Sequence, residues 1–483
     1  MEKIFNKRNA FFLAGFAVLF KIYLSAGLEL HPDEAYYWLW SAHPALGYYD
    51  HAPMVAYFIK LTTLFSDSEL FVRLSSVLVT VFLSFLVWIF SKKLFNEAAA
   101  AASVMVLNTM PLMLVGSVVI TPDTPLFLFW SFAVYFLWKF TESGRQKYWY
   151  VTGLFFGLAM LSKYTGVLFV LCLFTYMIAG KKFDWLKNRH FYFMFAVSFI
   201  VFLPVIYWNL QHEWISFTYQ LKHGLYNAEF ATYVSEYLGT QALMAGPVIF
   251  IAGVFAAVKY LRTRDPEKIF LVSFSLPVIL FFAFTALKQK PGANWPAFAY
   301  FAFSIMSAQY MLGSKNKKNL LIAGIIFNTA ASLAVGLHAR HGIIPVYKFS
   351  RQAAVADATN WFSGWKALGR NLKERDIEYA VTHSHQWGAA IAYYARGKVT
   401  AVLDNVSKNR FNQFAFWDIP GNMDNAKTAL VRIDNRMEDD LTLIPGAEIY
   451  FVYRNGIPVR QYAVNEVDGY VMRSDIKSAR RQY

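Results

Sequence analysis

Long apolar runs, each closed by charged or turn-forming residues, divide roughly the first 340 residues of the chain. The stretches 98–122 and 191–211 contain no charged residue. About 20 apolar residues cross a bilayer as a helix, so both stretches are predicted to span the membrane. The same pattern predicts eleven spans, although 148–162 is short for a full crossing and a count of ten to twelve stays open. The predicted spans are 11–28, 72–91, 98–120, 122–138, 148–162, 164–180, 191–208, 241–258, 269–287, 296–312 and 319–338.

The chain becomes much more polar from Arg340 onwards. Short apolar stretches bounded by turn residues predict strands at 377–382, 399–403, 429–433 and 449–453, with a helix at 387–394. The predicted fold is therefore an α-helical, polytopic membrane domain over 1–339, followed by a soluble α/β domain over 340–483 with one small sheet.

Composition supports a membrane protein. The 483 residues are 57% hydrophobic and 16% charged, whereas soluble domains are typically about 25% charged. The formal charge of +15 would ordinarily suggest nucleic acid as a partner, but the basic residues flank the apolar runs, and we expect no nucleic-acid partner. The single cysteine, Cys172, excludes a disulfide framework and a cysteine-based metal site.

The basic residues also predict the orientation. Every second connection is rich in Lys and Arg, 19 in total, whereas the opposite set holds only Lys60, Lys163, Lys222, Lys288 and Lys290. The positive-inside rule then places the N-terminus in the cytoplasm and, with eleven spans, the C-terminal domain outside. Two long connections, 29–71 and 209–240, would lie on the same outer face, and the second is predicted to be a mobile flap.

The first outer connection carries two polar clusters. Asp33 and Glu34 follow a His-Pro pair, which is typical of residues that open and cap a helix. Tyr49, Asp50 and His51 form the second cluster, ahead of another proline. A structural cap explains the first pair by itself, whereas the two clusters together favour a binding or catalytic role.

A third carboxylate, Asp123, is predicted at the outer end of the third span. Ionisable residues at such a depth are costly and usually functional. Lys163, next to Tyr164, is predicted at the same level, either as the ion-pair partner of Asp123 or as a cation for an anionic ligand.

Two further lysines and an amide precede the tenth span. Lys288 and Lys290 supply positive charge, and Asn294 is followed by a tryptophan. An interfacial anchor accounts for the Asn-Trp pair, but carboxylates near lysines, bordered by Trp and Tyr, also suggest a site for a lipid-linked anion.

Together these motifs resemble the C-type (GT-C) integral-membrane glycosyltransferases, in the branch of the protein O-mannosyltransferases and the lipid A aminoarabinose transferase. The resemblance covers roughly the first 300 residues. The matching segments are Asp33-Glu34, Tyr49-Asp50-His51-Ala52-Pro53, Thr121-Pro122-Asp123, Ser162-Lys163 and Gly292-Ala293-Asn294-Trp295-Pro296.

The resemblance implies an inverting transfer from a polyprenyl-phosphate sugar to an acceptor on the periplasmic side of a bacterial inner membrane. Lipid A or its core is the expected acceptor, with a protein hydroxyl as the alternative. Asp33 would be the general base and Asp123 a second carboxylate of the pocket. Glu34, Tyr49, Asp50, His51, Lys163, Tyr164, Lys288, Lys290 and Asn294 would bind substrate, although His51 stands where the lipid A transferase carries a lysine.

Three alternatives remain open from the sequence. Asp33, Asp50, Asp123 and His51 could hold a divalent cation, although no cofactor is expected. A flippase for a lipid-linked sugar would show internal repeats, and no repeat is found. A non-catalytic sensor would read periplasmic ligands through its C-terminal domain.

Overall fold

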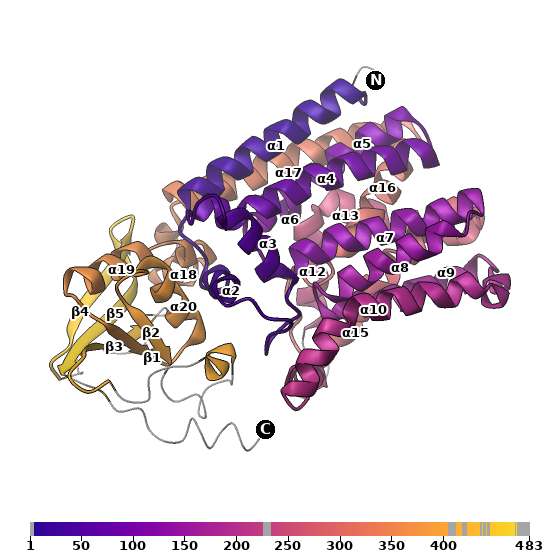
Figure 1. Ribbon diagram of the computed structural model, residues 1–483. Helices are drawn as coiled ribbons and strands as arrows, with labels where there is room; N and C mark the ends of the chain where they lie inside the picture. Colours follow the sequence, from indigo (N-terminus) through magenta and orange to yellow (C-terminus); the bar gives the residue numbers. More distant parts are fainter. Residues whose placement is uncertain are drawn as a thin grey trace. The chain divides into compact units, whose positions relative to one another are not determined.

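The computed structural model describes residues 4–225, 233–403, 412–417, 423–434, 437, 441, 445–468 and 470. The chain forms two compact units (Figure 1). The helical unit comprises 1–25, 51–58 and 73–333, and the mixed unit comprises 26–50, 59–72 and 334–483. The chain therefore enters the mixed unit three times, and the first outer connection contributes most of its residues to it.

The helical unit is built from helices alone in its described part (Figure 1). Its first half contains α1 (Lys7–Gly27), α4 (Glu69–Leu94), α5 (Glu97–Thr109), α6 (Pro111–Leu114), η1 (Gly116–Val118), α7 (Asp123–Ser143), α8 (Lys147–Met160), η2 (Tyr164–Val167), α9 (Leu168–Ala179) and η3 (Phe183–Lys187). Its second half contains α10 (Arg189–Gln211), α11 (Ile215–Leu225), α12 (Val234–Ala245), α13 (Pro247–Thr263), α14 (Pro266–Ser273), α15 (Leu276–Thr285), η4 (Ala297–Ala299), α16 (Tyr300–Met311) and α17 (Lys315–His341). Helices α1, α4 and α17 continue into the mixed unit at one end.

Each of the eleven predicted spans coincides with a helix or a broken pair of helices. Within the described residues, five helices are long and apolar enough to cross a membrane, or seven if two bent pairs each count as one span. The bends lie at Met110, between α5 and α6, and at Gly246, between α12 and α13. The multi-pass character is therefore confirmed, and the count of eleven stays a prediction.

Small residues permit close packing of α8 against α10. A Cβ atom at Gly153 of α8 would lie 2.4 Å from the carbonyl oxygen of Met194 in α10, and one at Gly157 would lie 2.7 Å from Cβ of Val201. Glycines four residues apart let two membrane helices approach until their backbones touch. This spacing fixes α8 against α10.

A lysine is fully buried inside the first span. Lys21 has no exposed surface, and its Nζ donates hydrogen bonds to the hydroxyls of Thr80 in α4 and Ser117 in η1, the latter at 2.6 Å. The Ser76 hydroxyl donates to the Ser117 carbonyl oxygen. Helices α1 and α4 thus hold the turn η1, which leads directly to Asp123.

The mixed unit surrounds a five-stranded sheet with the order β2-β1-β3-β5-β4. Its strands are β1 (Tyr379–Thr382), β2 (Thr400–Leu403), β3 (Lys427–Asp434), β4 (Glu448–Arg454) and β5 (Ile457–Asp468), and its helices are α2 (Pro32–Ala42), α18 (Arg351–Ala356), α19 (Trp365–Glu374) and α20 (His385–Tyr394). Short 3₁₀ helices are η5 (Val346–Lys348), η6 (Ala358–Phe362) and η7 (Gln413–Phe416), and α3 (Met54–Thr63) is shared by the two units.

The sheet is mixed. Strand β1 pairs in parallel with β2 and β3, with Tyr379 opposite Thr400 and Thr428, whereas β5 runs antiparallel to β3 and β4. The predicted small sheet and the predicted helix at 387–394 are confirmed. Strand β5 was not predicted, and neither were α18 and α19.

The two connections predicted on the outer face, 29–71 and 209–240, contain helices. The first contains α2 and α3, and α2 begins at Pro32, as the helix-cap interpretation predicts. The segment predicted as a flap, 209–240, contains the end of α10, α11 and the start of α12, and its residues 226–232 lie outside the described part. The described residues of this segment are therefore largely helical, and its role as a mobile flap stays a prediction.

Candidate functional site

The polar centre of the helical unit is the Asp123 carboxylate. The Nζ atom of Lys163 donates to both of its oxygens, at 2.8 and 3.0 Å, and the amide nitrogen of Asn294 donates to one of them at 2.6 Å. Thr121 Oγ1 lies 3.5 Å from the same oxygen. The side chains of Asp123 and Lys163 are only 9% and 10% exposed. The predicted residues Asp123, Lys163 and Asn294 thus form one buried cluster.

Three interruptions of helices bring this cluster together. Asp123 is the first residue of α7, where the free N–H groups favour a negative charge. Lys163 lies in extended conformation between α8 and η2. Asn294 lies just before η4, and its carbonyl oxygen accepts a hydrogen bond from the N–H of Ala297 at 2.9 Å. A continuous helix at any of these points would aim the side chain elsewhere.

An aromatic ring borders the cluster. The Trp295 ring centroid lies 5.9 Å from Lys163 Nζ, within the range of a cation–π interaction. A Cβ at Gly292 would lie 2.5 Å from Trp295 Nε1, so this glycine leaves the space that the indole occupies. The ring therefore depends on the Gly292-Ala-Asn-Trp segment that the sequence singles out.

Tyr164 and the two other lysines lie outside the cluster. The Tyr164 hydroxyl shares a hydrogen bond of 2.8 Å with Ser216 of α11. Lys290 is exposed and forms an ion pair with Glu236 of α12, which raises the pKa of the lysine. Lys288 is exposed. None of the three shows a contact with Asp123 among the described residues.

His51 belongs to the helical unit, in the segment 51–58. It is half-buried, and the residues that follow it, Ala52 and Pro53, are buried. The backbone N–H of Met54 donates to the carbonyl oxygen of Leu161 at 3.2 Å. The segment after His51 is thereby tied to the turn that carries Lys163.

In the mixed unit, Asp33 and Glu34 begin helix α2. His31 is the N-cap: its Nδ1 accepts from the Asp33 N–H at 3.2 Å, and Glu34 Oε2 accepts from the His31 N–H at 2.9 Å. This reciprocal arrangement is a capping box, which satisfies two N–H groups of the helix start. Glu34 is fully buried in this role, whereas the Asp33 side chain is 39% exposed.

Asp50 and Tyr49 are joined to the C-terminal part of the chain by a chain of hydrogen bonds. The Tyr36 hydroxyl donates to Asp50 Oδ2 at 2.8 Å and accepts from the Gln413 N–H at 2.8 Å. The Tyr49 N–H donates to Oε1 of Gln413, also at 2.8 Å. All four residues are buried. The sequence predicts Tyr49 and Asp50 as site residues but gives no sign that Tyr36 and Gln413 hold them.

Glu29 connects the start of the first outer connection to α19. Its carboxylate accepts from the Trp365 N–H at 2.7 Å and the Lys366 N–H at 3.2 Å. Burial raises the pKa of this carboxyl, and the N–H groups oppose that shift. Burial also lowers the pKa of Arg460 to about 10, while the negative charge of Glu29 opposes that change. The Arg460 guanidinium lies 4.3 Å from the Trp365 ring centroid.

No set of three or more His, Cys, Asp or Glu side chains suited to a metal occurs among the residues that the structure describes. Asp123 is engaged by Lys163 and Asn294, and Asp50 accepts from Tyr36.

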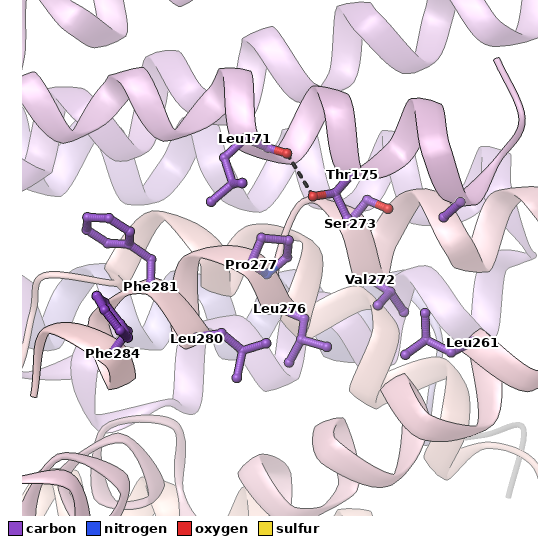
Figure 2. Close-up of a pocket in the computed structure, with 11 residues that line it drawn as sticks. Leu171, Thr175, Leu261, Val272, Ser273, Leu276, Pro277, Leu280, Phe281 and Phe284 are labelled. Carbon is purple, nitrogen blue, oxygen red and sulfur yellow. Dashed lines mark hydrogen bonds between the residues drawn. The ribbon is translucent and has the colours of Figure 1, made fainter. Parts of the chain in front are cut away.

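The helical unit also holds an open apolar groove of about 470 Å³. Figure 2 shows Leu171 and Thr175 of α9 on one side of it, with Phe281 and Phe284 of α15 at one end. The Thr175 hydroxyl donates to the Leu171 carbonyl oxygen at 2.8 Å, so its donor is used within the helix. Such a lining fits a hydrocarbon chain.

Known proteins share both sequence and fold with this chain. Residues 50–208 match the family of dolichyl-phosphate-mannose-protein mannosyltransferases. The lipid A galacturonosyltransferase RgtD of Rhizobium johnstonii is 30% identical over 320 residues. The match covers 62% of this chain and 64% of RgtD, so it spans just under two thirds of that relative.

Solved structures extend the likeness over nearly the whole chain. ArnT of Cupriavidus metallidurans, bound to undecaprenyl phosphate, superposes with a TM-score of 0.68 at 14% identity and covers 94% of this chain and 97% of its own. The chain has the GT-C fold. An oligosaccharyltransferase of Archaeoglobus fulgidus matches it with a TM-score of 0.50 at 12% identity, over 89% of the chain and 70% of that structure. The resemblance that the sequence motifs indicate is confirmed.

The buried ion pair of Asp123 and Lys163 gives a first prediction. Lys163→Met should cost about 3–5 kcal/mol of stability, because it leaves a buried carboxylate without its counter-ion. Adding Asp123→Asn should restore part of the loss, since the double variant buries no net charge. Thermal unfolding in detergent measures both. Lys290→Met removes an exposed ion pair and should leave the unfolding temperature unchanged. An equal fall of the unfolding temperature in Lys163→Met and Lys290→Met would contradict a larger contribution of the buried ion pair.

A second prediction concerns the hydroxyl between Asp50 and Gln413. Tyr36→Phe removes the acceptor of the Gln413 N–H, a loss of about 1–3 kcal/mol for a buried group. Hydrogen exchange at that N–H should accelerate about tenfold or more. Tyr347→Phe, at an exposed position of the same unit, should leave the exchange rate unaltered. Unchanged protection in Tyr36→Phe would show that the hydroxyl does not hold η7.

Proposed function

We propose that the chain is an inverting glycosyltransferase that moves a sugar from a polyprenyl-phosphate donor to a lipid acceptor, lipid A or its core, at the outer face of a bacterial inner membrane. The observation that carries the proposal is the 30% identity over 320 residues to a lipid A galacturonosyltransferase. The shared fold with ArnT bound to undecaprenyl phosphate supports the class of donor.

The reaction requires a bond exchange at the anomeric carbon of the donor. The acceptor oxygen forms a bond to this carbon while the bond to the phosphate oxygen breaks, and the electron pair leaves with the polyprenyl phosphate. The transition state has oxocarbenium character, which a nearby carboxylate stabilises. A hydroxyl acceptor must also lose its proton.

Asp33 is our proposed general base for that proton. Its carboxylate is 39% exposed, whereas Glu34 is buried and used in the capping box. A partly exposed carboxylate on a fixed helix start is accessible to an acceptor and cannot rotate freely. If the acceptor is a phosphate group, it is already an anion, and Asp33 then serves in orientation.

Asp123 is our proposed second carboxylate, and its partners explain how it keeps a negative charge while buried. Lys163 neutralises it, and Asn294 fixes one oxygen. The departing phosphate needs further positive charge. Lys163, Lys288 and Lys290 remain the proposed phosphate-binding residues, and Lys288 is exposed with no ion pair among the described residues.

The donor's hydrocarbon tail would need an apolar surface within the membrane-spanning part. The groove between α9 and α15 offers about 470 Å³ lined by leucine, phenylalanine and proline. We propose that the two domains predicted from the sequence have separate roles. Residues 1–339 bind the donor, and residues 340–483 form a periplasmic domain.

The match of residues 50–208 to protein mannosyltransferases favours one alternative acceptor, a serine or threonine hydroxyl of a protein. The two acceptors differ in a direct assay. With a lipid acceptor, thin-layer chromatography would show label in lipid A, separated from the labelled donor, whereas with a protein acceptor gel electrophoresis would show label in polypeptide.

A third prediction tests the reaction. Purified protein in detergent should transfer label from polyprenyl-phosphate galacturonic acid or aminoarabinose to lipid A. Asp33→Asn should reduce kcat by about 10²–10⁴-fold, the contribution of a general base. The control is Asp67→Asn. Asp67 is an exposed carboxylate of the same unit and is not part of the proposed site. Transfer by Asp33→Asn at the wild-type rate to a hydroxyl acceptor would exclude Asp33 as the base.

A fourth prediction tests the orientation. Because Cys172 is fully buried, a Cys172→Ser background allows single cysteines to be placed at exposed sites. A membrane-impermeant maleimide applied to intact spheroplasts should label Glu374→Cys, whereas Lys7→Cys should react only after lysis. The opposite pattern would reverse the proposed topology.

A further inference from the structure

A glutamine of the C-terminal sequence holds the carboxylate that we propose as the base. The amide nitrogen of Gln386, in the first turn of α20, donates a hydrogen bond to Asp33 Oδ1 at 2.7 Å. The two residues are 353 positions apart in the chain and belong to the same compact unit. No motif in the sequence points to this contact.

The neighbouring histidine does not replace this hydrogen bond. His31 Nδ1 lies 3.6 Å from Asp33 Oδ2, which is too long for a hydrogen bond. The same Nδ1 accepts from the Asp33 N–H, so in the neutral ring it carries the lone pair and has no proton to donate. Among the described residues, the Asp33 carboxylate has polar contacts with two side chains outside the first turn of α2. Gln386 donates a hydrogen bond to it, and His31 Nδ1 approaches it to 3.6 Å.

Helix α20 is a rigid support for Gln386. The Leu30 N–H donates to the Tyr394 hydroxyl at 2.6 Å, and the Tyr393 hydroxyl donates to the Asp67 carbonyl oxygen at 2.6 Å. The Tyr393 ring also packs edge-on against Trp38 of α2, with centroids 4.9 Å apart. The end of α20 is thus fastened on both sides, and its first turn keeps Gln386 against α2.

We propose that Gln386 is a positioning residue for the transfer reaction: it fixes Asp33 Oδ1 so that Oδ2 faces the acceptor hydroxyl and receives its proton. The amide keeps both of its own protons throughout. This inference rests on the proposed function, because it assigns a role to Gln386 through Asp33.

The isosteric replacement Gln386→Glu gives the sharpest test. It sets a second carboxylate against Asp33, and two carboxylates at this distance cannot both be ionised without strong repulsion. At high pH the variant loses the hydrogen bond. At low pH the pair shares one proton, and the introduced carboxyl group, once protonated, can again donate to Asp33. Misfolding alone would not produce this recovery.

The experiment measures kcat and KM for both substrates between about pH 6 and pH 8.5. A hydrogen bond to a charged group contributes about 1.5–3 kcal/mol, so kcat of Gln386→Glu should fall about 10–100-fold at the upper pH and recover most of that loss at the lower one. The KM for the donor should stay within about threefold. The other titratable side chains at these two helix ends, His31, Glu34 and His385, are common to all variants, so the difference between profiles reports the exchanged residue.

Gln461 offers a matched control. Its amide nitrogen donates to Asp434 Oδ2 at 3.1 Å, so Gln461→Glu creates the same kind of carboxylate pair in the sheet of the same unit. This control should keep the wild-type pH profile. If Gln386→Glu does not fold, Gln386→Asn takes its place: it retains the amide but is one methylene too short, and it should lower kcat at all pH values without changing the profile.

The outcomes are distinct. An active wild type together with a Gln386→Glu variant that keeps full kcat at the upper pH would overturn the role of Gln386 alone. An equal pH-dependent loss in Gln461→Glu would overturn it as well, because the effect would then come from any carboxylate pair in the unit. A wild type inactive with every donor and acceptor would overturn the proposed function, and this inference with it.

Discussion

The helical unit buries the side chain of Asp123, and the pairing of Asp123 with Lys163 offsets the cost of that burial. Taking a charge out of water costs several kcal/mol, which is offset only when the partner is close and well oriented. Two lysine hydrogen bonds and one amide hydrogen bond supply that partner. The breaks before α7, after α8 and before η4 follow from the same requirement, since each aims one side chain at this point.

In the mixed unit, hydrogen bonds of buried polar groups fix the conformation. Its residues 26–50 are fixed by helix capping, by Glu29 at the start of α19 and by the Tyr36 hydroxyl, all of which use polar groups that would otherwise be left unsatisfied on burial. The C-terminal sheet supplies many of these partners. A segment that begins as the exit from the first span therefore takes its conformation from residues more than 300 positions later.

Sequence reasoning identified the elements well where one property decided them. Hydropathy located the helices that coincide with the eleven predicted spans, and the His-Pro-Asp-Glu segment indicated the start of α2, because a helix cap is a local interaction. It also paired Lys163 with Asp123 as one alternative, since few charges occur at that depth. The partners Tyr36, Gln386 and Gln413 could not be predicted, because a Tyr or Gln that bonds to a residue more than 300 positions away looks like any surface residue in the sequence.

The elements that the sequence did not predict also depend on contacts with distant parts of the chain. Strand β5 was missed because its residues mix charges with apolar positions and depend on two flanking strands for their pairing. Helix α11 was not predicted within the connection 209–240, which was expected to be a mobile flap because of its length, and Tyr164 bonds to Ser216 of this helix. Tertiary contacts stabilise helices whose sequences alone are marginal.

Lys21 has a consequence for how the protein is made. Its amine is buried against hydroxyls of α4 and η1, which follow α1 in the chain. A lysine inside a single helix adds roughly 3 kcal/mol to the cost of insertion, and the polar partners that lower this cost arrive 59 and 96 residues later. The burial of Lys21 in α1 therefore depends on helices that follow α1 in the chain.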